Sequence, residues 1–190
     1  MKKILTIIVL LAFFVVTASA QTGHLEFMGI PITGTPIQMG QKLKAKGFTF
    51  KGNLDEDIRE YTGKFAGNNV SLYVASQNNN VWKIVVDYIR SNSFTTLKST
   101  YNKMVTQFTL KYGDPMGHFE YFIDPYYEGD GFELQALKSQ KCCYFTGWSL
   151  EKGNISVTIS AIPSILISYE DLDGVNKKQD NESEQILNDI

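Results

Sequence analysis

Cysteine and histidine are scarce in this 190-residue chain, which has two residues of each type. Cys142 and Cys143 are adjacent, and a disulfide between neighbours would close a small, strained ring. We therefore expect free thiols or an intermolecular bridge, with the two side chains on opposite faces of a strand. No Cys-x-x-Cys spacing accompanies His24 and His118, so we expect neither a metal site nor a cofactor.

Positive charge is not in excess either. The chain has 18 basic and 20 acidic residues, a formal charge of −2. Loss of the N-terminal leader described below would remove Lys2 and Lys3 and leave a formal charge of −4. Nucleic acid is therefore a poor candidate partner.

Long apolar runs are missing except at the N-terminus. Lys2 and Lys3 precede an apolar run over residues 4–16, and small residues follow as far as Ala20. The run is shorter than the ~20 residues of a membrane-spanning helix and is typical of a secretory signal peptide. We predict a signal peptide over residues 1–20, cleaved after Ala20, and a periplasmic or secreted mature chain without a membrane span. Gln21 offers no sulfur for a lipid anchor.

Sequence motifs of common enzyme classes are absent from the chain. No G-x-S-x-G nucleophile elbow occurs, and no glycine-rich phosphate loop follows a predicted strand. His24 and His118 have no evident orienting acid beside them, so we interpret both as surface histidines, with His24 at a frayed terminus. An enzymatic role is therefore disfavoured.

Hydrophobic periodicity predicts an α+β fold. Thr35, Pro36 and Gln38 form a capping box that starts a helix running to Lys46, and Gly47 ends it. A second, longer helix is predicted from Ser93 to residue 112, where apolar residues recur every three or four positions. Alternating residues predict strands elsewhere: 24–34, 48–52, 59–67, 70–76, 81–89, 118–124, 142–150, 155–161 and 165–172. Segment 132–140 is ambiguous between helix and strand. Trp82 and Trp148 are expected in the core.

The order of these elements predicts an antiparallel sheet covered by one short and one long helix, in a single domain over residues 21–172. Helix and strands occur twice in this order, which leaves open two tandem units, 24–91 and 92–172. The polar composition of residues 173–190 predicts a flexible tail.

An acidic, aromatic loop lies between the strand ending near Asp124 and the ambiguous segment. We predict a ligand-binding site there, because aromatic side chains on a loop offer large contact area at low entropic cost. Its residues are Asp124, Tyr126, Tyr127, Glu128, Asp130 and Phe132. Alternatives are a plain solvated turn, a glycosidase-type carboxylate pair that includes Glu133, or calcium binding, although the spacing matches no EF-hand loop.

Three short phrases carry a resemblance: LEFMGIPITG (25–34), LKAKGF (43–48) and LKYGDP (110–115). With them the chain resembles a family of small exported proteins of unknown function from Gram-negative anaerobic bacteria, to which no catalytic residues are assigned. The repeated order of helix and strands is also similar, at the level of fold, to domains like beta-lactamase inhibitor protein.

These observations predict an exported, non-enzymatic protein that binds a protein or small ligand of the cell envelope, on the sheet face left free by the helices or through the loop. The alternatives are an envelope hydrolase that uses loop 124–133 and an inhibitor of an extracytoplasmic enzyme.

Overall fold

The computed structural model describes residues 23–189, so the predicted signal peptide lies outside the described residues. Fourteen elements follow one another along this part of the chain. They are β1 (Glu26–Phe27), β2 (Ile30–Pro31), α1 (Pro36–Ala45), β3 (Thr49–Asn53), β4 (Ile58–Phe65), β5 (Asn68–Gln77), β6 (Asn80–Arg90), α2 (Phe94–Tyr112), β7 (Gly117–Phe122), α3 (Glu133–Lys138), β8 (Cys142–Leu150), β9 (Gly153–Ile159), β10 (Ser164–Asp171) and α4 (Leu172–Asp189). The ambiguous segment thus contains helix α3.

Eight strands form one antiparallel sheet in the order β3-β4-β5-β6-β10-β9-β8-β7, and β1 and β2 pair separately. This confirms the α+β class with an antiparallel sheet. Each of α1 and α2 precedes a four-stranded meander, and the last strands of the two meanders, β6 and β10, pair in the middle of the sheet. The element order is that of two tandem units, and the duplication itself stays a prediction.

The two predicted helices begin where their capping residues place them. The Thr35 side chain accepts from the Gln38 N–H while the Gln38 side chain accepts from the Thr35 N–H, which is the predicted capping box. Ser93 caps α2 by accepting from the Thr96 N–H. Gly113 ends α2 with a φ of 85°, a conformation that favours glycine.

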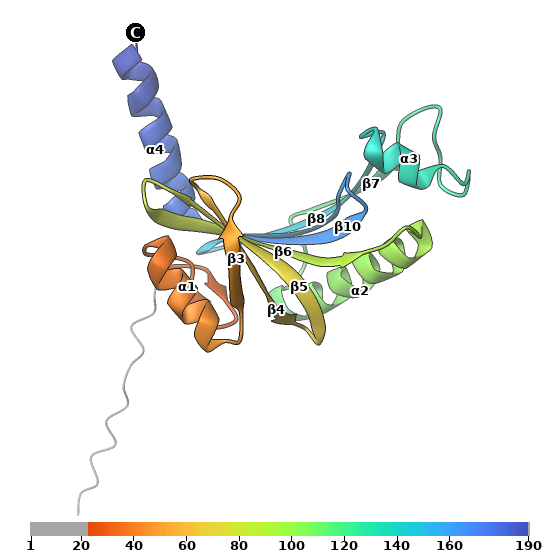
Figure 1. Ribbon diagram of the computed structural model, residues 1–190. Coiled ribbons are helices and arrows are strands. Elements are labelled where there is room, and N and C mark those ends of the chain that lie inside the picture. The colour runs from red at the N-terminus through yellow and green to blue at the C-terminus, as the bar shows by residue number, and fades with distance from the viewer. Residues whose placement is uncertain (1–22, 190) are drawn as a thin grey trace, which may run out of the picture.

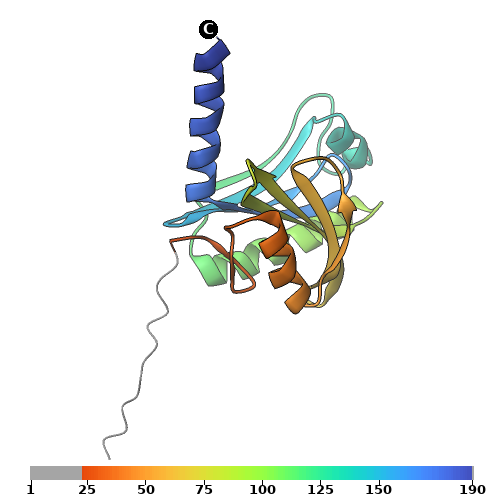
Figure 2. The ribbon, with the colours of Figure 1, turned by 60° about the vertical axis from the view of Figure 1, so that its left-hand side comes forward.

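One hydrophobic core joins both helices to one face of the sheet. A row of buried side chains crosses the sheet from β4 to β8. It consists of Tyr61, Leu72, Val86, Ile167, Val157 and Thr146. Met39 and Leu43 of α1, and Leu97 and Tyr101 of α2, belong to the same set of buried residues. Figures 1 and 2 show α1 and α2 on one side of the sheet, with α4 and α3 at opposite ends of β8 to β10.

Trp148 is buried as expected, but Trp82 is not a core residue. The pairing of β5 with β6 shifts between Ala75 and Ser76, so Val81, which is 2% exposed, takes the inward position next to Ile84. This bulge, which the alternation in the sequence does not reveal, leaves Trp82 partly exposed.

Residues 172–189 form α4, within the segment 173–190 for which we expected a flexible tail. Its first turn packs closely on Trp82, because a Cβ placed at Gly174 would lie 2.6 Å from the Trp82 Cβ. Lys178 then lies over the Trp82 ring, 4.8 Å from its centroid. Within residues 23–189, no helix combines the length and apolarity needed to cross a membrane.

Candidate functional site

The acidic side chains of the predicted loop site fix the shape of the loop. The Asp130 carboxylate accepts from the backbone N–H groups of Tyr127, at 3.0 Å, and of Phe132, at 2.7 Å. Glu133 accepts from the Gly129 N–H at 3.0 Å. Carboxylates bonded to their own backbone in this way stabilise a turn, which is the structural alternative that we left open.

Glu128 links the loop to α2 and β8 through hydrogen bonds. Its carboxylate accepts from the Lys98 ammonium of α2 and, at 3.1 Å, from the Tyr144 hydroxyl of β8. The hydrogen bond from Lys98 lowers the pKa of Glu128. Burial raises the pKa of Tyr144, so its hydroxyl stays protonated and can donate. A glycosidase-type general acid needs a raised pKa, and Glu128 is shifted in the opposite direction.

We predict that Lys98→Met raises the pKa of Glu128 while changing stability by less than about 1 kcal/mol near neutral pH, because the Glu128 side chain is 54% exposed. A lowered folded-state pKa contributes stability above the unfolded pKa and loses it as the pH falls through the folded value. The free energies of unfolding of the variant and the parent should therefore become equal at acidic pH, where Glu128 is protonated in both. NMR titration of the Glu128 carboxyl and urea unfolding at two pH values measure both effects. Lys103→Met, on the exposed side of α2, is the control, and an unmoved Glu128 pKa in Lys98→Met would contradict the assignment.

Two of the three aromatic rings in the loop are open to solvent. Tyr127 and Phe132 are 65% and 59% exposed, whereas Tyr126 is partly buried. Asp124 is also exposed at the start of the loop. The structure therefore brings the predicted residues together on one loop whose rings can make contacts and whose carboxylates largely serve the turn.

The sheet face opposite α1 and α2, called the open face from here on, is a second candidate surface. Its central row runs across seven strands, and every member is partly exposed while the neighbouring row is buried. The row consists of Glu60, Tyr73, Val85, Ser168, Ser156, Gly147 and Gly117. In Figure 1 the part of the open face that belongs to β8–β10 lies between α4 and α3.

Large apolar side chains gather where the open face reaches its edge strand β7. Phe119 and Tyr121 are 53% and 50% exposed, and they lie opposite Phe145 and Cys143 of β8. A protein surface seldom gathers such side chains without a contact function. This group was not predicted from the sequence, although the alternation of Gly117, Phe119 and Tyr121 marks one face of β7.

The two cysteines are free and occupy opposite faces of β8, as expected from their adjacency. Cys143 lies on the open face across from Tyr121. Cys142 packs against the core, and burial raises the pKa of its thiol to about 12. Cys142 therefore carries little thiolate at neutral pH.

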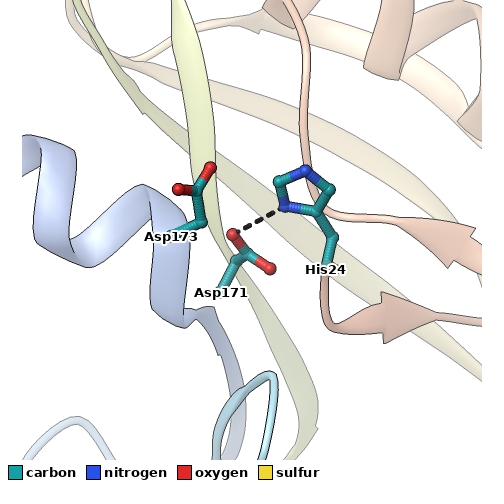
Figure 3. A group of neighbouring side chains, drawn as sticks. All are labelled: His24, Asp171 and Asp173. Carbon is teal, nitrogen blue, oxygen red and sulfur yellow. Dashed lines mark hydrogen bonds and ion pairs between the residues drawn. The ribbon is translucent and has the colours of Figure 1, made fainter. Parts of the chain in front are cut away.

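His24 is part of a buried junction, and our expectation of a surface histidine at a frayed end is wrong. Asp171, at the end of β10, is fully buried, and its carboxylate accepts from the Leu25 N–H at 2.7 Å and from the Gly174 N–H at 3.0 Å. The same carboxylate lies 3.0 Å from Nδ1 of His24, as Figure 3 shows. Asp171 thus caps α4 and holds the N-terminal segment against β10.

His24, Asp171 and Asp173 also have the donor atoms of a metal site, since one ligand atom from each lies within 4.8 Å of the others. However, Lys177 forms an ion pair of 2.7 Å with Asp173, and both Asp171 oxygens already accept hydrogen bonds. The geometry therefore favours a structural junction over a cation site.

His118 completes a chain of hydrogen bonds that leads into the core. Its Nδ1 lies 2.8 Å from the Thr146 hydroxyl, which lies 2.6 Å from the Tyr101 hydroxyl. Tyr101 is fully buried, and burial raises its pKa to about 12. The chain satisfies two buried hydroxyls, and Tyr101 lies beyond the reach of a substrate.

Comparisons with protein-family models, with curated proteins and with solved structures found no match. The function is therefore argued from the residues of this chain alone.

Proposed function

We propose that the chain works outside the cytoplasm as a non-enzymatic binding protein that holds a component of the cell envelope on its open face. The observation that carries the proposal is the exposed aromatic group at the β7 end of a sheet whose other face packs against α1 and α2. Binding proteins use such exposed aromatic side chains as anchors. The rigid loop with Tyr127 and Phe132 offers a second contact.

The state of the polar groups supports a role without catalysis. Glu128, Asp130 and Glu133 are engaged in hydrogen bonds that hold the loop, and the lowered pKa of Glu128 opposes general-acid chemistry. Tyr101 and Thr146 are enclosed in the core. These contacts favour binding over the envelope hydrolase that the acidic loop suggested.

Co-sedimentation of the purified mature chain with the insoluble envelope fraction of the producing cells tests the proposal. The double variant Phe119→Ala/Tyr121→Ala should weaken binding by about tenfold or more, because two exposed anchors are lost. The control Ile37→Ala/Leu110→Ala changes two residues of α1 and α2 that are 62% and 78% exposed, and should bind like the parent.

Failure of the parent chain to co-sediment would count against the proposal. An equal loss of binding in both double variants would also count against it, because that result would show that the contact does not lie on the open face. Circular dichroism spectra and melting curves show whether each variant is folded.

A further inference from the structure

We propose that the β7–β10 half of the open face binds an uncharged carbohydrate, with a sugar ring stacked on Phe119 and Phe145. This inference rests on the proposed function, because it names the ligand class of the same surface. It depends on three features of that half of the sheet, which are the pose of the two rings, the absence of unpaired charge and the adjacent hydroxyl groups.

The two rings lean toward the glycines of their own strands. Phe119 pairs with Phe145 across the strands, and Gly117 pairs with Gly147. A Cβ built at Gly147 would lie 3.0 Å from ring atoms of Phe145, and one at Gly117 would lie 3.2 Å from the ring of Phe119. Each ring therefore leans along its own strand with an edge toward the glycine two residues away, and Phe119 remains 53% exposed.

This pair of rings, called the ring platform from here on, suits the apolar side of a sugar. The ring centroids are 6.2 Å apart, and the ring planes differ by 37°. The face of an aromatic ring is electron-rich and attracts weakly positive C–H groups, which a pyranose ring presents on its flat sides. The glycine beside each ring has no side chain, which leaves room for a ligand to lie across both strands.

The charge of this half of the open face fits a neutral ligand. Among the side chains that β7, β8, β9 and β10 place on it, the one charged group is Glu170, and Glu170 forms an ion pair of 2.7 Å with Lys83. Charged groups gather instead on the β4–β6 side, where Asp87 pairs with Arg90. A surface without free charge is a poor match for nucleic acid, an acidic lipid headgroup or a charged peptide.

Hydroxyl groups stand beside the ring platform on the next strand. Thr158 lies opposite Phe145, and Ser156 lies opposite Gly147. The Thr158 hydroxyl donates to the Tyr144 carbonyl at 2.8 Å, so its oxygen remains an acceptor. Apolar rings next to uncharged hydroxyls match a sugar, which has an apolar face and a rim of hydroxyl groups.

The test repeats the co-sedimentation after two separate treatments of the envelope fraction. Periodate cleaves the vicinal diols of sugars, and proteinase K removes exposed protein. We expect binding to be lost after periodate and kept after proteinase. Binding that is lost after proteinase and kept after periodate would overturn the carbohydrate inference in favour of a protein partner, while the proposed function would stand. No binding to untreated envelope would overturn both.

Variants of the platform test its geometry. Gly147→Ala should weaken binding to the proteinase-treated fraction by about tenfold, because the new Cβ displaces the Phe145 ring. Phe119→Trp keeps a flat ring and should bind within about threefold of the parent. The control Ser99→Ala removes an exposed hydroxyl of α2, on the opposite side of the sheet, and should bind like the parent. Equal binding by Gly147→Ala and the parent, at unchanged melting temperature, would overturn the platform.

Discussion

Replacing Asp171 by alanine is expected to lower the free energy of unfolding by about 3 to 5 kcal/mol. The carboxylate is fully buried and accepts from the N–H groups of Leu25 and Gly174, next to His24. Its removal leaves two backbone donors without an acceptor and deprives α4 of its N-cap. Urea unfolding near neutral pH measures the change.

Asp171→Asn is the matched variant, because the amide keeps one acceptor oxygen and the size of the side chain. It should be destabilised by less than the alanine variant. His24→Ala should cost less again, because 25% of the His24 side chain is exposed and both backbone donors keep their acceptor. A loss of under about 1 kcal/mol in Asp171→Ala would contradict the junction as the link between the N-terminal segment, β10 and α4.

Gly153→Ala is expected to destabilise the domain by more than about 3 kcal/mol or to prevent folding. Gly153 pairs with Asp171 at the start of β9, and a Cβ placed there would lie 2.1 Å from the Glu170 carbonyl oxygen. Backbone atoms of a central strand cannot move aside without breaking the β9–β10 ladder. Gly153 and Asp171 thus belong to one tightly packed corner.

Gly29→Ala separates this steric effect from simple backbone strain. Gly29 has a φ of 75° with nothing within 4 Å of its missing Cβ, so alanine there should cost about 1 to 2 kcal/mol. Thermal or urea unfolding compares the two variants. Equal stability losses in Gly153→Ala and Gly29→Ala would show that the close approach to Glu170 is not the cause.

Local signals in the sequence predicted most of the framework. The capping box at Thr35 placed the start of α1, because side-chain oxygens satisfy backbone donors within one turn. The apolar spacing placed the start of α2 at Ser93, which the structure shows to be its N-cap. Alternation placed the strands of the main sheet, because one buried face imposes a period of two. Segment 24–34, which we predicted as one strand, instead forms the short β1–β2 hairpin. The recurrence of apolar residues every three or four positions predicted a helix with one buried face, and its residues Leu97 and Tyr101 are buried against the sheet.

Features that depend on distant parts of the chain were not predictable in the same way. His24 meets Asp171 across 147 positions of sequence, and no local pattern joins them. The shift of Val81 into the core depends on a bulge opposite β5, so alternation alone assigned Trp82 to the wrong side. Aspartate is a common helix N-cap, so Asp171 could have indicated the start of α4. The polar composition after it indicated a tail instead.

The candidate site was predicted in part. The loop from Asp124 to Phe132 does expose Tyr127 and Phe132, but its carboxylates serve mainly to hold the turn. The ring platform depends on the register of β7 and β8, which pairs Phe119 with Phe145 and Gly117 with Gly147. Strand register is a property of the folded sheet, so the residues of β7 alone could not reveal the platform.

Mapping of amide chemical shifts by NMR, with soluble neutral oligosaccharides released from the envelope as the probe, shows whether the ring platform binds a neutral sugar. We expect shifts concentrated at Phe119, Phe145, Ser156 and Thr158, with none along α2. Shifts confined to α1 and α2 would contradict binding at the ring platform. So would the absence of shifts at protein concentrations that give binding to the untreated envelope.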